Sequence, residues 1–139
     1  MKFQYTIIPT LDPTRQWLGR PMLPIVAHGP TQSTAVAALV DSGADHSVFH
    51  ADIARDIGLV LESGTREVFS GVEGGALPAW LHRLSIEVVG IEGVCPLVAG
   101  FVDSPGVSAI LGQDGFFDAH RIKVEKDHNT FEISPVRKK

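Results

Sequence analysis

The sequence predicts a single all-β domain with one or two short helices, and three observations support this prediction. The chain has 139 residues, of which 44% are hydrophobic and 20% charged, which suits one domain with its own core. Its 14 glycines and 9 prolines separate short apolar segments along the whole chain, as in a β-rich fold with many turns. Leu84, Ile86 and Val88 alternate with Ser85 and Glu87, and this period of two is typical of a half-buried strand.

Eight segments are expected to form strands, because each is rich in apolar residues and bounded by turn residues. They cover residues 3–8, 23–28, 33–40, 67–71, 81–89, 94–102, 122–124 and 130–134. The stretch 35–40 is apolar throughout, which predicts a strand that is covered on both faces.

Two segments depart from the strand pattern. Residues 51–57 place Ile53, Ala54 and Ile57 on one face of a helix, and Gly58 is suited to end it. Residues 115–120 fit a second short helix, and Asp114 is expected to cap that helix at its N-terminus.

Charge and composition exclude several classes of protein. The net charge of −4, from 12 Lys and Arg against 16 Asp and Glu, argues against a dedicated nucleic-acid binder. No apolar run approaches the ~20 residues of a membrane-spanning helix, and the first residues lack the apolar stretch of a secretory signal. We therefore expect a cytoplasmic protein with neither a nucleic-acid nor a membrane partner.

The cysteine and histidine residues do not indicate a metal site. Cys95 is the single cysteine, which excludes an internal disulfide and a multi-cysteine zinc site. It lies in an apolar segment and is interpreted as a buried small residue rather than a nucleophile. His46 and His50 lack the spacing partners of a zinc motif. No metal ion or cofactor is expected.

The most informative segment runs from Ala37 to Asp45. An apolar strand delivers Asp41 into a turn of small residues, in which Ser42 can hydrogen-bond locally and Gly43 permits close backbone approach. An acidic residue after a strand most often only forms a turn, so a second element is needed to indicate a site.

That second element lies further along the chain, where Ile110, Leu111 and Gly112 precede a short helical pattern. The two segments, with the glycine-containing stretch 68–75 between them, resemble the retropepsin-like aspartic proteases, including cellular members of bacterial type. The resemblance covers roughly residues 21–133. It implies a closed retropepsin-like β-barrel, the acid protease fold, with a flap hairpin.

The resemblance also implies roles for particular residues. Asp41 would be the catalytic aspartate, and Ser42, Gly43 and Ala44 would complete the active-site loop. The apolar pair and glycine, Ile110, Leu111 and Gly112, would support that loop from behind. Substrate would contact Asp45 and the flap, whose residues are Gly71, Val72, Glu73, Gly74 and Gly75.

The chemistry of this family requires two carboxylates that flank one water molecule. The chain has one Asp-Ser-Gly turn, since the similar Asp103-Ser104-Pro105-Gly106 has proline where the turn needs glycine. The second carboxylate must then come from another copy of the chain, which predicts a homodimer. The implied function is an aspartic endopeptidase that acts on extended peptides. The alternative is a catalytically silent dimerisation or peptide-binding module with the same barrel.

The sequence departs from the viral members of the family at two positions. Ser42 replaces the common threonine and keeps the hydroxyl that, in the family, hydrogen-bonds across the dimer. Gln113 replaces an arginine that pairs with the acidic residue matching Asp45, so this salt bridge cannot form here.

Three regions are expected along the chain. Residues 1–20 precede the resemblance and are expected to form an N-terminal extension or arm. Residues 21–136 would form the protease domain, and residues 137–139 a basic tail.

Overall fold

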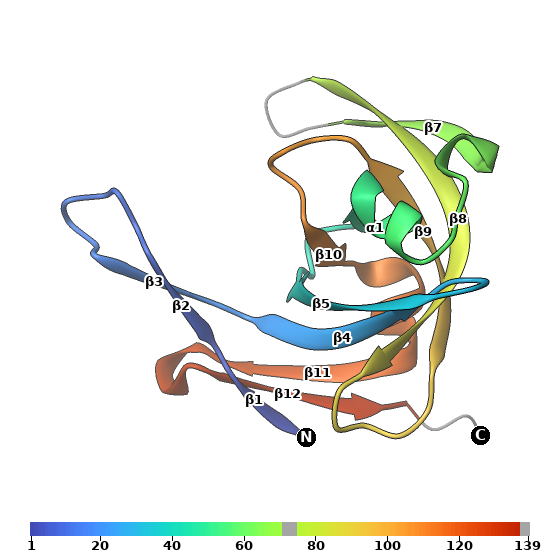
Figure 1. The fold of residues 1–139 in the computed structure, drawn as a ribbon. Helices are drawn as coiled ribbons and strands as arrows, with labels where there is room; N and C mark the ends of the chain where they lie inside the picture. The colour runs from blue at the N-terminus through green and yellow to red at the C-terminus, as the bar shows by residue number, and fades with distance from the viewer. Residues whose placement is uncertain (71–74, 137–139) are drawn as a thin grey trace.

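The computed structural model describes residues 1–70 and 75–136, whose strands form a closed barrel (Figure 1). Six strands make the ring, in the order β4, β5, β10, β6, β9 and β8, and β4 pairs back with β8 to close it. β7 extends the sheet beyond β8. The predicted closed β-barrel is therefore confirmed. The strand bounds are β4 Met22–His28, β5 Ser33–Val40, β6 Ser47–His50, β7 Thr65–Ser70, β8 Ala76–Val88, β9 Cys95–Val102 and β10 Ala109–Leu111.

The barrel is filled by alternate side chains of its strands. Leu84, Ile86 and Val88 of β8 are all buried, as their alternation predicts. Phe49 of β6 and Phe101 of β9 have no exposed surface, and their ring centroids lie 5.7 Å apart. Each such side chain stabilises the fold by about 1.5–3 kcal/mol relative to an exposed position. The core of the barrel therefore includes inward-facing side chains of β6, β8 and β9.

A second sheet packs below β4 in the view of Figure 1. It has the order β1-β12-β11, with β1 Lys2–Gln4, β11 His120–Glu125 and β12 Thr130–Pro135. Phe131 and Ile133 of β12 are buried and belong to the same apolar core as the barrel. The N-terminal amino group donates a hydrogen bond of 2.7 Å to the carbonyl of Ile133.

The predicted first helix is confirmed as α1, Ala51–Asp56, with Ile53 and Ala54 buried. His50 caps it, because its Nδ1 accepts a hydrogen bond of 3.0 Å from the backbone N–H of Asp52. Gly58 follows with φ +86°, a backbone conformation suited to the end of a helix. Elsewhere in the described part of the chain there are two short 3-10 turns, η1 Leu61–Ser63 and η3 Lys126–His128.

The second helical segment begins earlier than predicted, as the π-helical turn η2, Gln113–Phe117. The prediction that Asp114 caps it is wrong. Gly115 has φ +86° and interrupts the turn directly after Asp114. The freed N–H of Gly115 donates instead to the carboxylate of Asp118, at 3.1 Å.

The N-terminal segment 3–8 does not form one strand. It divides at Tyr5, whose backbone N–H donates to the carbonyl of Asn129 at 2.8 Å and whose ring lies against Phe131. β1 therefore joins the second sheet, whereas β2, Thr6–Pro9, pairs with a strand that the sequence did not predict, β3, Trp17–Arg20.

Two other predictions need correction. β8 begins at Ala76 rather than Leu81, because it pairs with β7 as far as Ser70 opposite Ala76. The first half of β5 is not covered on both faces, since Ala35 and Ala37 are exposed. Within residues 1–70 and 75–136, no helix has the length and apolar character needed to cross a bilayer.

Candidate active site

Asp41 lies at the point where β5 leaves the barrel ring. β10 runs parallel to β5, with Leu111 opposite Val40. The backbone N–H of Asp41 donates to the carbonyl of Leu111 at 3.0 Å, which extends this pairing into the loop. The aspartate is therefore fixed by a buried three-residue strand rather than by a free loop.

The turn that follows orients the carboxylate of Asp41. The backbone N–H of Gly43 donates to Oδ1 of Asp41 at 2.9 Å, and the N–H of Ala44 donates to the Asp41 carbonyl at 3.2 Å. Asp41 is half-buried, while Ser42 and Gly43 are exposed. Oδ1 is thus engaged by the chain itself, and among the described residues Oδ2 has no hydrogen-bond partner.

The segment after β10 holds the other side of the same loop. The backbone N–H groups of Gln113 and Asp114 donate to the carbonyls of Ala44 and Asp45, at 2.8 and 2.9 Å. The side-chain Nε2 of Gln113 donates to the carbonyl of Ser42 at 2.8 Å. Gln113, which cannot form the salt bridge of the viral members, therefore tethers the loop by neutral hydrogen bonds.

Gly112 occupies a position where no side chain fits. A Cβ atom there would lie 2.5 Å from the carbonyl oxygen of His46 and 2.6 Å from that of Ala44. Both atoms belong to the backbone that follows Asp41. The structure thus places Ile110, Leu111 and Gly112 directly behind the loop that carries Asp41, Ser42, Gly43 and Ala44.

Ser47 is a supporting residue that the sequence analysis missed. It has no exposed surface, and its Oγ accepts a hydrogen bond of 3.1 Å from the N–H of Gly112. This bond satisfies a buried backbone donor beside the Asp41 loop. A serine at the start of an apolar strand carries no sequence signal for this role.

The two remaining polar residues of the loop lie at its outer edge. Asp45 is exposed, and its carboxylate makes no hydrogen bond or ion pair within the described part of the chain. The ring of His46 stacks on Phe69 of β7, with centroids 5.6 Å apart and planes 7° from parallel. Nδ1 of His46 lies 4.0 Å from the Asp114 carboxylate. The stack joins the Asp41 loop to the β7–β8 hairpin.

The predicted flap falls mostly outside the described residues. Gly71, Val72, Glu73 and Gly74 are not described, and Gly75 is exposed with open space around it. The strands on either side, β7 and β8, pair in register from Thr65 opposite Leu81 to Ser70 opposite Ala76.

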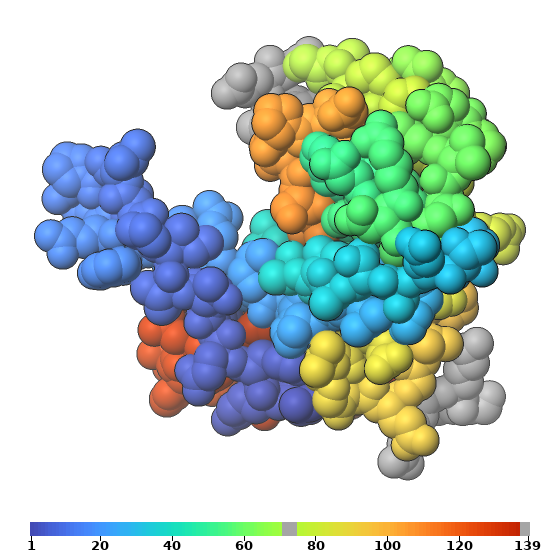
Figure 2. Space-filling model, viewed as in Figure 1, coloured from blue at the N-terminus to red at the C-terminus, as the bar shows by residue number. Residues whose placement is uncertain are grey.

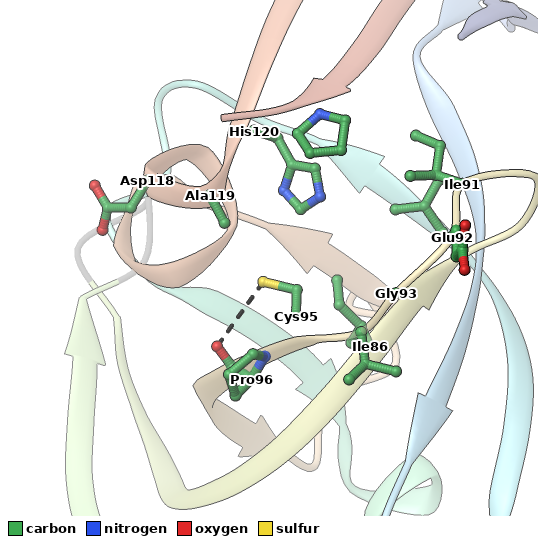
Figure 3. A pocket seen from close by; sticks show the side chains of 12 residues that line it. Ile86, Ile91, Glu92, Gly93, Cys95, Pro96, Asp118, Ala119 and His120 are labelled. Atoms are coloured by element: carbon green, nitrogen blue, oxygen red, sulfur yellow. Dashed lines mark hydrogen bonds between the residues drawn. The ribbon is translucent and has the colours of Figure 1, made fainter. Parts of the chain in front are cut away.

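No group of three or more metal-ligating side chains occurs in residues 1–70 and 75–136. A cavity of about 410 Å³ lies away from Asp41, between the β8–β9 turn and the start of β11. Its lining includes Cys95 and His120 (Figure 3). Burial raises the pKa of the Cys95 thiol, which agrees with its interpretation as an inert core residue. Nδ1 of His120 lies 2.9 Å from the carbonyl of Phe116.

Comparisons with solved structures identify the fold. The retropepsin-like aspartic protease of Rickettsia conorii superimposes with a TM-score of 0.60 and 16% identity, over 96% of this chain and 98% of that one. The retroviral protease-like domain of Ddi1 from Leishmania major gives 0.57 and 23%, over 83% and 90%. The EIAV protease complexed with the inhibitor HBY-793 gives 0.54 and 22%, over 78% and 92%.

The sequence comparisons locate the family signal. No curated protein sequence matches the chain. The family model described as aspartyl protease matches residues 28–114, which is more than half of the chain. The matched region contains both the Asp41 loop and the Ile110-Leu111-Gly112 segment that supports it. The chain belongs to the retropepsin-like aspartyl protease family.

Proposed function

We propose that this chain is an aspartic endopeptidase that hydrolyses peptide bonds as a homodimer, with one Asp41 carboxylate from each subunit. The observation that carries the proposal is the geometry of the Asp41 loop. Its carboxylate is half-buried at the end of β5, oriented through Oδ1 by the Gly43 N–H, and held in place by β10. An aspartate that only formed a turn would not need the additional hydrogen bonds that β10 and the segment after it make to this loop.

The proposed chemistry uses two such carboxylates around one water molecule. Held about 3 Å apart, they cannot both ionise, so the pair shares one proton. The ionised member accepts a proton from the water as the oxygen attacks the scissile carbonyl, and the protonated member polarises that carbonyl. The pair then supplies a proton to the leaving amine. Oδ2 of Asp41, free within the described chain, is the oxygen available for this work.

The homodimer follows from the composition of a single chain. Each subunit supplies one Asp-Ser-Gly turn. A two-fold axis beside Asp41 would bring the two loops face to face. Ser42, which is exposed on this loop, is proposed to hydrogen-bond across the same axis.

The substrate is proposed to be an extended peptide segment held partly as an added β-strand. Asp45, exposed next to the catalytic turn, is the candidate contact to the substrate backbone. The β7–β8 hairpin is the candidate flap, with Gly71, Val72, Glu73, Gly74 and Gly75 at its tip. The His46–Phe69 stack keeps the part of this hairpin nearest its tip next to the Asp41 loop.

The function is tested with a peptide library incubated with the parent chain and, in parallel, with Asp41→Asn. We expect products from the parent alone. Equal cleavage in both samples would reveal a contaminating protease. Cleavage in neither would favour the silent dimerisation or peptide-binding module.

The rate should depend on pH as a bell-shaped curve that peaks under acidic to mildly acidic conditions. At high pH both carboxylates of the pair ionise, and at low pH both are protonated, so the active singly protonated state is lost in each direction. The measurement is kcat/KM for one cleaved peptide across the pH range. A flat profile would contradict the shared-proton mechanism.

A further inference from the structure

The N-terminal residues 6–20 form a hairpin, here called the arm, that projects from the body of the molecule (Figures 1 and 2). β2 and β3 pair along their length, from Thr6 opposite Arg20 to Pro9 opposite Trp17. The tip is an ordered turn, because the Asp12 carboxylate accepts hydrogen bonds from the N–H and hydroxyl of Thr14, at 2.9 and 2.7 Å. These two bonds also lower the pKa of Asp12. The arm is therefore a shaped element rather than a loose terminus.

The arm carries large apolar side chains that the rest of the chain does not cover. Leu11 is 104% exposed, Trp17 61% and Ile7 50%. Ile7 and Trp17 lie on the same face, because their cross-strand partners are Gly19 and Pro9, two positions apart in the register. A two-stranded hairpin is at best marginally stable by itself in water. An exposed apolar face on such a hairpin therefore indicates an interaction surface.

The root of the arm lies next to the catalytic aspartate. The arm continues through Pro21 into β4, and the carbonyl of Pro21 accepts a hydrogen bond of 3.0 Å from the N–H of Val40. Met22, the first residue of β4, stands opposite Leu39. In Figure 1 the arm, the end of β5 and the connection between β9 and β10 all lie on the same side of the molecule. A second subunit that approaches Asp41 from this side would therefore meet the arm as well.

We propose that the arm packs on a second copy of this chain, with Ile7, Leu11 and Trp17 buried against it. This inference rests on the proposed function, in which a second copy must stand opposite Asp41. The two-fold axis makes the exchange reciprocal, so each subunit gives one arm and receives one. The arm thereby stabilises the dimer that completes the active site. Because each dimer has two arms, both contribute to its stability.

The test compares two double variants by sedimentation equilibrium over a range of protein concentrations. Leu11→Ser with Trp17→Ser removes the apolar side chains of the arm. Val60→Ser with Val94→Ser is the matched control, because those side chains are 67% and 61% exposed but lie outside the arm. Truncating a buried apolar side chain at an interface typically weakens the affinity about tenfold or more. Since each dimer has two arms, we expect the dimer dissociation constant to rise at least about 100-fold in the arm variant and to stay within about twofold in the control.

Three further readouts separate a failure of this inference from a failure of the proposed function. Circular dichroism must show that both variants are folded, which their surface positions favour. The arm variant should regain parental cleavage at protein concentrations high enough to restore the dimer, whereas Asp41→Asn should keep the parental dissociation constant without cleaving. A dissociation constant unchanged in the folded arm variant would overturn the inference even if the chain cleaves peptides. The inference would equally be overturned if the parent were monomeric, or if loss of the arm weakened only the binding of a different protein.

Discussion

Asp41→Asn is expected to lower kcat/KM for peptide cleavage by at least about 10³-fold, the scale of a lost general acid–base group. Asparagine cannot share or accept the proton that the proposed pair of carboxylates would exchange. Its side-chain oxygen can still accept the hydrogen bond that the Gly43 N–H donates to Oδ1 of Asp41. The loop and the dimer should therefore persist, so that kcat/KM falls because the chemical step is impaired and not because the chain unfolds. Thermal unfolding and sedimentation of the variant check this point.

Asp103→Asn is the matched control for this loss. Asp103 begins the other Asp-Ser segment of the chain, and its side chain is 72% exposed. The same change of charge and shape should there leave kcat/KM within about twofold, as for most surface substitutions. A fully active Asp41→Asn variant would remove this residue from the mechanism. Equal losses in both variants would point to a general effect of charge.

Gly112→Ala is expected to damage both stability and activity. The added methyl group would lie 2.5 Å from the carbonyl oxygen of His46 and 2.6 Å from that of Ala44. Backbone cannot rotate away as a flexible side chain can, so the loop that carries Asp41 must shift. We expect a loss of about 1–3 kcal/mol in the free energy of unfolding, as for other overpacked sites. Because catalytic geometry tolerates little displacement, kcat/KM should fall about 100-fold.

Gly106→Ala provides the comparison for Gly112. Gly106 is exposed, and a Cβ atom there would meet nothing within 4 Å. Urea unfolding and peptide cleavage should show this variant close to the parent. If Gly112→Ala behaved in the same way, the tight contact behind the catalytic loop would not limit the conformation of the loop.

The closed barrel could be predicted only through the family resemblance, since the strand patterns alone did not predict β6 or β10. The Asp41 loop and the segment behind it could be predicted because their signals are local. An apolar strand that ends in Asp-Ser-Gly, and an apolar pair followed by glycine, are each encoded by adjacent residues. The structure adds the reason for the glycine after this pair, since at position 112 only glycine fits against the backbone of Ala44 and His46. The buried face of β8 could also be predicted from the sequence, because every second side chain of the strand faces the same core.

The remaining features depend on contacts between segments far apart in the chain. The break at Tyr5 follows from its contacts with Asn129 and Phe131 in the C-terminal sheet, and nothing near Tyr5 indicates them. β3 exists because it pairs with β2 across the ordered turn at Asp12. Asp114 does not cap the helix that the sequence predicts after it, because Gly115 has a positive φ and its N–H donates to the Asp118 carboxylate instead.

The central claim is that one active site requires an Asp41 from each of two subunits. The most direct test keeps the amount of parent chain constant and adds a ninefold excess of Asp41→Asn chain. The two are unfolded together in denaturant and refolded, so that subunits pair at random. Only about one tenth of the parent chains then find a parent partner, and the shared site predicts that activity falls about tenfold. The same excess of Asp103→Asn chain should cause no fall. Unchanged activity with excess Asp41→Asn would show that each subunit works alone, and would contradict the shared site.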